Sequence, residues 1–209
     1  MTRAADGDMR AGTTAVALRR ARVGPTPWTT TRQVHGANVV TIDAPEGAMA
    51  IDADAIVTTA RNVPIAMLGA DCALIAFTSA EGPIGIAHSG WKGLVAGVIE
   101  TTVTALRSLG AVEIAAYSSP MIHPECYEFS PGDLDAVVAR LGDGIRAMTS
   151  TGRPALDLPR GVAEALSRSG VSNVTVLGGC TACEGDWFSW RARRDEARHA
   201  LVCCRGDDA

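Results

Sequence analysis

The sequence lacks the features that mark membrane, exported and nucleic-acid-binding proteins. No apolar run approaches the roughly 20 residues of a membrane span, and residues 1–10 have no apolar segment typical of a signal peptide. The net charge of −4 gives no basic footprint for nucleic acid. We therefore expect no membrane or nucleic-acid partner. We also expect a cytoplasmic location, in which the six cysteines stay reduced.

A chain of 209 residues with 47% hydrophobic and 20% charged residues is long enough and balanced enough to form one globular domain. Strand and helix patterns alternate irregularly, with several hairpins, which favours an α+β fold with mixed sheets over a doubly wound parallel sheet. Candidate strands are 39–42, 52–57, 63–68, 114–117, 174–177 and 199–203. Candidate helices are 94–109, a second beginning at Ser130 and a third at Asp157. Residues 1–30 are weakly patterned.

The most informative stretch is 69–93, which reads as two buried strands, 73–78 and 84–88, joined by a turn at 81–83. Cys72 opens the first strand and His88 closes the second. Because the entry of one antiparallel strand lies beside the exit of the next, these two side chains are expected at the same end of the hairpin.

A metal site can be assembled from Cys72 and two of the four histidines in the chain, His35 and His88. Zinc accepts this Cys/His2 set readily, and a catalytic zinc keeps three protein ligands with one place open to water. Bound water then has its pKa lowered to about 7. The alternative is a buried cysteine with two structural histidines at strand ends. Spacing alone does not decide between them, because the three residues lie far apart in the chain.

Two further patterns are candidates for anion or base binding. Gly90, Lys92 and Gly93 stand at the start of a helix, where exposed backbone N–H groups and a positive charge suit a phosphate; a tight strand-to-helix turn is the alternative. The segment 188–198 combines aromatic residues with arginines that could hold a planar base or a phosphate, or form a solvated basic face. Cys180 and Cys183 could be a redox pair, half of a metal site, or free thiols.

Taken together, a series of short motifs resembles the YfiH-like family over roughly residues 30–202. The motifs are Gln33-Val34-His35-Gly36, Asp52-Ala53-Asp54-Ala55, Asp71-Cys72, His88-Ser89-Gly90-Trp91-Lys92-Gly93, Tyr127-Glu128, Leu156-Asp157-Leu158, Cys180-Thr181 and Phe188-Ser189-Trp190-Arg191. That family was long labelled a multicopper polyphenol oxidase (laccase). It is now interpreted as zinc-dependent purine nucleoside phosphorylases with adenosine deaminase and methylthioadenosine phosphorylase activities.

The resemblance implies a single-domain four-layer α/β sandwich over residues 1–209, with zinc held by His35, Cys72 and His88. The chain departs from the family in residues 1–30, which are shortened and divergent, and near Arg198, where the family carries a Gly-Arg pair and this chain has Ala197. Both departures concern the substrate end of the pocket, so Arg3 and Arg198 are only candidate phosphate ligands.

The implied chemistry is cleavage of the glycosidic bond of adenosine, inosine or methylthioadenosine by phosphate. Zinc-activated water would serve a deaminase reaction at the purine C6. Gly90, Lys92, Gly93, Arg3 and Arg198 are the candidate phosphate-binding residues. Asp71 and Gln33 are expected to orient ligands or water from outside the coordination sphere.

Three rival hypotheses remain open. A copper-dependent, laccase-like phenol oxidase would use the same His2Cys set, but only His123 and His199 are left for the trinuclear cluster of a true multicopper oxidase, so Cu²⁺ is less favoured than Zn²⁺. A metal-free hydrolase would use Cys72 as nucleophile and His88 as base. A binding module would hold a purely structural zinc. The oligomeric state is not indicated.

Overall fold

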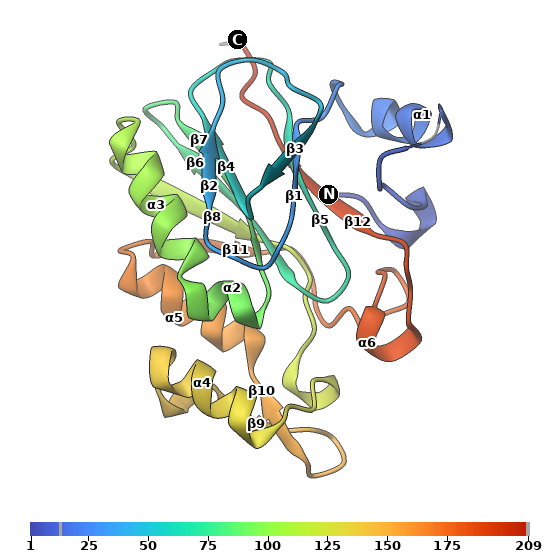
Figure 1. Ribbon diagram of the computed structural model, residues 1–209, viewed down its shortest axis with the longest axis vertical. Coiled ribbons are helices and arrows are strands. Elements are labelled where there is room, and N and C mark those ends of the chain that lie inside the picture. The colour runs from blue at the N-terminus through green and yellow to red at the C-terminus, as the bar shows by residue number, and fades with distance from the viewer. Residues whose placement is uncertain (13, 208–209) are drawn as a thin grey trace.

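The computed structural model describes residues 1–12 and 14–207, and the arrangement of its elements is shown in Figure 1. The strands are β1 Thr30–Arg32, β2 Val39–Thr41, β3 Ala48–Asp52, β4 Ala55–Thr58, β5 Ile65–Gly69, β6 Ala73–Ser79, β7 Ile84–Ser89, β8 Ile114–Ser118, β9 Arg146–Met148, β10 Pro154–Leu156, β11 Asn173–Val176 and β12 His199–Cys203. The helices are η1 Ala4–Asp6, α1 Thr14–Val23, α2 Trp91–Ala96, α3 Val98–Ser108, η2 Pro124–Cys126, α4 Pro131–Leu141, η3 Asp143–Ile145, α5 Leu158–Arg168 and α6 Trp190–Arg193.

The central element is a six-stranded sheet in the order β11-β8-β6-β7-β4-β2. Its four inner strands pair antiparallel, whereas the outer strands β11 and β2 pair parallel to β8 and β4. A separate antiparallel pair, β5 and β12, forms a small second sheet. The expected mixed sheets are therefore confirmed.

Side-chain alternation along the strands builds the layers. Ile75 and Phe77 of β6 point to the helices and join their core, whereas Leu74 and Ala76 point to the small sheet, where they pack with Met67 and other apolar residues. The outer face of β5 and β12 is covered in turn by Met9 and Trp28 of the N-terminal segment. Helices α2 to α5, the large sheet, the small sheet and the N-terminal segment with α1 make four layers (Figure 1).

The central hairpin has the expected register. β6 and β7 pair antiparallel, with Leu74 opposite His88 and Ala73 opposite Ser89. Cys72 immediately precedes β6, so it lies at the same end of the hairpin as His88, as the sequence predicts. Of the helices in residues 1–12 and 14–207, none is long and apolar enough to cross a membrane.

The helix predictions hold at two sites and fail at one. Ser130 and Asp157 cap α4 and α5, each accepting a backbone N–H three residues later. The single helix expected over 94–109 is wrong: two helices, α2 and α3, are divided at Gly97, whose φ of 87° is left-handed. The apolar spacing continues through the break because both helices face the same sheet. The weakly patterned N-terminal region also contains α1, which its sequence did not predict.

Replacing Gly97 by alanine should destabilise the fold, because a Cβ at positive φ costs about 1–2 kcal/mol. Gly132 is the matched control: it lies inside α4, and a Cβ there would meet nothing within 4 Å. Gly132→Ala should therefore raise the free energy of unfolding slightly, by about 0.5 kcal/mol. Urea unfolding of both variants measures the two effects; shifts of the same sign would contradict the role given to Gly97.

Candidate metal centre and adjoining pocket

His35, Cys72 and His88 converge from three segments that are distant in the chain. The Cys72 Sγ lies 3.9 Å from His35 Nε2. The ring centroids of His35 and His88 are 4.7 Å apart, and the angle between the ring planes is 76°. One ligand atom from each residue falls within 4.8 Å of the others. Neighbouring ligand atoms around a tetrahedral zinc are about 3.3–3.6 Å apart at ordinary zinc–ligand lengths. The donor set and its spacing therefore fit a zinc ion with three protein ligands.

The carboxylate of Asp54 holds both histidines in place. Its Oδ1 lies 2.9 Å from His88 Nδ1, and it accepts the backbone N–H groups of Val34, His35 and Gly36 at 3.1, 2.9 and 2.7 Å. The side chain is fully buried. With Nδ1 occupied by Asp54, His88 offers Nε2 as its ligand atom. The same oxygens fix the loop that carries His35, whose φ is 61°.

Cys72 and His88 shift each other's pKa because they lie close together in a buried site. Burial disfavours the charged forms of Cys72 and His88, but their mutual attraction outweighs it. His88 and His35 lower the pKa of Cys72 to about 6. The Cys72 thiolate and the bond to Asp54 raise the pKa of His88 to about 9. These shifts favour the thiolate of Cys72 and the imidazolium of His88 at neutral pH. A divalent cation would take the proton's place, because zinc binds thiolate and neutral imidazole.

Gly90 leaves room for the side chains of Cys72 and His35 because it has no Cβ. A Cβ at this position would lie 2.8 Å from Cys72 Sγ and 3.1 Å from His35 Cδ2. Any larger residue would therefore press on two of the three ligands. The sequence predicts a phosphate-binding role for Gly90, and the structure adds a steric one, because a Cβ here would press on two candidate metal ligands.

A cavity of about 560 Å³ opens beside the three ligands. Its wall includes three arginines, Arg10, Arg191 and Arg198, and two aromatic residues, Tyr127 and Trp190. Among the described residues that line it, Asp71 is the one that carries a carboxylate. A cavity with this lining suits an anion joined to a planar, partly apolar group.

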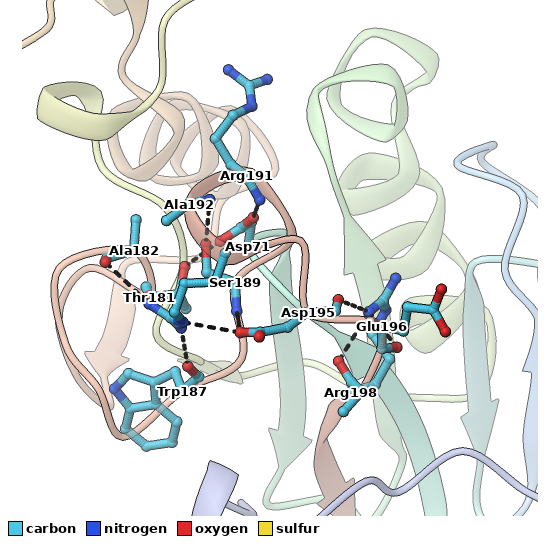
Figure 2. Close-up of polar contacts among 12 residues, drawn as sticks. Asp71, Thr181, Ala182, Trp187, Ser189, Arg191, Ala192, Asp195, Glu196 and Arg198 are labelled. Carbon is cyan, nitrogen blue, oxygen red and sulfur yellow. Dashed lines mark hydrogen bonds and ion pairs between the residues drawn. The ribbon is translucent and has the colours of Figure 1, made fainter.

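Asp71 organises the far wall of this cavity. One carboxylate oxygen accepts the Thr181 hydroxyl at 2.7 Å and the other accepts the backbone N–H of Arg191 at 2.6 Å (Figure 2). Asp71 therefore fixes the start of α6 beside the pocket. It positions a wall residue, whereas Asp54 holds the candidate ligand His88.

Other residues expected at the site lie at different distances from it. Arg198 and Gln33 line the cavity, and Gln33 bonds through its amide to the backbone N–H and C=O of Leu68. Lys92 lies over the ring of Trp91 and does not line the cavity. Arg3 pairs with Asp186 at 3.2 Å and is likewise outside the cavity wall.

Gly93 is also away from the cavity, buried against Val98. Sequence reasoning missed Arg10 and gave Asp54 no separate role. Asp54 belongs to the motif Asp52-Ala53-Asp54-Ala55, so the sequence marks the residue but does not indicate that it positions His35 and His88. No local signal marks Arg10.

A family model described as "Multi-copper polyphenol oxidoreductase laccase" matches residues 8–205 of this chain. The chain belongs to this family. The predicted resemblance is thereby confirmed, and the family extends over both the ligand-bearing strands and the loops of the pocket wall.

Curated relatives and solved structures agree with this assignment. The chain is 40% identical over 173 residues to "Purine nucleoside phosphorylase ORF3" of Streptomyces griseus, covering 80% of this chain and 70% of the relative. It is 33% identical over 186 residues to a purine nucleoside phosphorylase of Xylella fastidiosa, covering 84% and 71%. The structure of YlmD from Geobacillus stearothermophilus superposes with a TM-score of 0.82 at 27% identity, covering 96% of this chain and 85% of YlmD.

The structure of Bacillus licheniformis hypothetical protein YfiH superposes with a TM-score of 0.84 at 22% identity, covering 95% of this chain and 85% of that one. At that identity the likeness concerns the fold alone. It confirms the expected single-domain α/β architecture with mixed sheets.

Asp54→Asn should destabilise the metal-free protein by about 2–4 kcal/mol, because an amide N–H₂ would replace a charged acceptor that faces only donors. Asp52→Asn is the matched control, since Asp52 lies two residues away on the surface and pairs there with Arg32; it should leave stability nearly unchanged. Urea unfolding with a chelator present separates this effect from metal binding. Equal stability of the two variants would contradict the role of Asp54.

Proposed function

We propose that this protein is a zinc-dependent purine nucleoside phosphorylase that acts on adenosine, inosine or methylthioadenosine and also deaminates adenosine. The observation that carries the proposal is the position of His35, Cys72 and His88 at the wall of a cavity lined by arginines and aromatic rings. The relatives named purine nucleoside phosphorylase, at up to 40% identity, support it.

The metal would be Zn²⁺ held by His35, Cys72 and His88. When bound with its fourth place open, it supplies Lewis acidity at the cavity wall, which suits the deaminase reaction at the purine C6. Asp54 keeps His88 in one tautomer by accepting its Nδ1–H, so the opposite nitrogen faces the ligand position.

Arg198 and Arg10 are the residues proposed to bind phosphate. The Nη1 of Arg198 donates to the backbone oxygens of residues 195, 196 and 197 at 2.8, 2.6 and 2.9 Å, which fixes the guanidinium in one orientation (Figure 2). Arg10 is held by Asp8 at 2.8 Å. Rigid guanidinium groups lose little entropy when they bind an oxyanion, so they suit this role better than Lys92.

The purine would lie against Trp190 and Tyr127. Trp190 is 45% exposed, and the guanidinium groups of Arg194 and Arg198 lie 5.5 and 6.0 Å from its ring centroid. Tyr127 is buried and carries the Arg191 guanidinium 4.7 Å above its ring. Planar bases stack on such surfaces.

In phosphorolysis an oxygen of phosphate forms a bond to C1′ of the sugar and the C–N glycosidic bond breaks. The bonding electron pair leaves with the purine, and the sugar becomes a pentose 1-phosphate. Positive charge develops on the sugar in the transition state, so a bound phosphate both attacks and stabilises it. The arginines would place the phosphate and compensate its charge.

The zinc-loaded protein, incubated with adenosine, inosine or methylthioadenosine, should release free base and pentose 1-phosphate only when phosphate is present. Chromatography of the products measures this. Chelation should abolish turnover, and zinc should restore it. Cys72→Ala should lose activity with unchanged circular dichroism, since a catalytic metal is not needed for folding; unfolding would favour a binding module with a structural zinc. Inosine formed from adenosine without phosphate reports deamination alone, and no base release with zinc and phosphate would refute the phosphorylase.

Arg198→Ala should raise the KM for phosphate about 10- to 100-fold, because a charged hydrogen bond contributes about 1.5–3 kcal/mol. Lys92→Ala, which removes an exposed cation outside the cavity, should leave that KM within about twofold. Initial rates at varied phosphate concentration distinguish them. If Lys92→Ala were the more damaging change, phosphate would bind at the start of α2 instead.

A second candidate, a metal-free hydrolase with Cys72 as nucleophile and His88 as base, draws support from the lowered pKa of Cys72, about 6. Activity that persists under chelation and is lost on alkylation of Cys72 would favour it. A laccase-like copper enzyme has weaker support. Within the part of the chain that the structure describes, the two remaining histidines lie apart from the ligand group, and His199 is buried against Trp187 and Phe188.

A further inference from the structure

A second group of soft ligands lies outside the centre described above. Cys126 ends η2, Cys180 follows β11, and Cys183 lies in the next turn. Their sulfur atoms all fall within 4.8 Å of one another, with Cys126 and Cys183 only 3.1 Å apart. Three thiols from two distant segments therefore meet at one point.

The spacing in each segment is the spacing of zinc ligands. Cys180 and Cys183 are separated by two residues, and so are His123 and Cys126. Paired ligands of this kind, joined as Cys3His, are typical of structural zinc sites. The fold brings the two pairs together through the bridge between Met121 and Cys180 and the bond from Thr181 N to Met121 O at 3.1 Å.

Groups around the thiols already suit a metal. The backbone N–H of His123 donates to Cys180 Sγ at 3.4 Å, a bond that stabilises a thiolate ligand. The imidazole of His123 is partly exposed, with Nδ1 3.7 Å from a carboxylate oxygen of Glu125. That same oxygen lies 3.9 Å from Cys183 Sγ, so His123 and Glu125 border the thiols on one side. Cys180 is buried and Cys183 exposed, which gives an ion a path from solvent.

We propose that Cys126, Cys180 and Cys183, with His123 as fourth ligand, form a second, structural zinc site. Thiolate-rich sets select zinc over magnesium or calcium. Zinc binding displaces the thiol protons and involves no change in oxidation state. The site uses none of the residues assigned to the first metal or to the pocket, so the inference stands independently of the proposed reaction.

The second site would also stiffen the pocket wall. Tyr127, which lines the cavity, follows Cys126 directly. Thr181, which follows Cys180, donates to Asp71, and Asp71 in turn accepts the backbone N–H of Arg191 (Figure 2). An ion that ties η2 to the turn after β11 therefore fixes the two chain segments on which this wall is built.

The test is the metal content of the full-length protein after equilibration with Zn²⁺ and removal of free metal. Elemental mass spectrometry should find two equivalents in the unaltered protein. Cys183→Ser and Cys72→Ser should each retain one, and the double variant none. Cys204→Ser, a thiol outside both groups, should retain two. Cys72→Ser should lose the zinc of the first site and Cys183→Ser the zinc of the second site, so failure of one site is distinguishable from failure of the other.

A measurement on the unaltered protein covers variants that fail to fold. Zinc should protect Cys126, Cys180 and Cys183 from maleimide, as peptide mass spectrometry would show, while Cys204 reacts at an unchanged rate. The proposal would be overturned if the unaltered protein bound only one zinc equivalent and Cys183→Ser bound the same amount. A Cys126–Cys183 disulfide that forms even when reductant and zinc are present would also overturn it, because these two thiols would then be a redox pair.

Discussion

The buried carboxylate of Asp54 is the interaction on which the candidate centre depends. A buried charge without partners costs several kcal/mol, so it forces donors to gather around it. Here the donors are the His88 ring and three successive N–H groups of the loop around His35. The backbone oxygen of Asp54 also accepts the N–H of His88 at 2.7 Å. One residue thus sets the relative position of two candidate ligands, His35 and His88, that are 53 positions apart in the sequence (88 − 35).

The parts of the fold that follow from local rules were predictable. The hairpin of β6 and β7 has two apolar runs and a glycine-proline turn, and its register places Cys72 beside His88. The caps Ser130 and Asp157 mark the starts of α4 and α5 by side-chain chemistry that acts over three residues. Gly97 was not predictable in this way, because apolar spacing continues through it and only the packing of two helices on one sheet requires its positive φ.

The binding residues were predictable as a group and not one by one. The segment 188–198 carries aromatic and guanidinium side chains suited to a base or phosphate, and the fold divides them. Trp190, Arg191 and Arg198 line the cavity, while Arg193 bonds to backbone oxygens of Thr181, Ala182 and Trp187 and supports the turn instead. The left-handed Arg194, which ends α6, changes the chain direction between them. Such a division depends on tertiary contacts.

Lys92 shows the opposite case, in which a local pattern that suits an anion lies outside the wall of the cavity beside His35, Cys72 and His88. Glycines and a cation at a strand-to-helix junction are common where anions bind, yet α2 is only six residues long and its lysine lies over Trp91. The compact Gly90 is explained by the sulfur and imidazole that it faces. At Gly90 the small residue therefore meets a steric need, because a Cβ there would lie 2.8 Å from Cys72 Sγ.

The two walls of the cavity differ in what supports them. The ligand wall rests on the hydrogen-bond ladder of a six-stranded sheet, whereas the opposite wall consists of surface turns joined through Asp71. Surface turns tolerate insertion and exchange far better than sheet interiors do. Changes confined to these turns can therefore alter which molecules fit the cavity while the positions of His35, Cys72 and His88 stay the same.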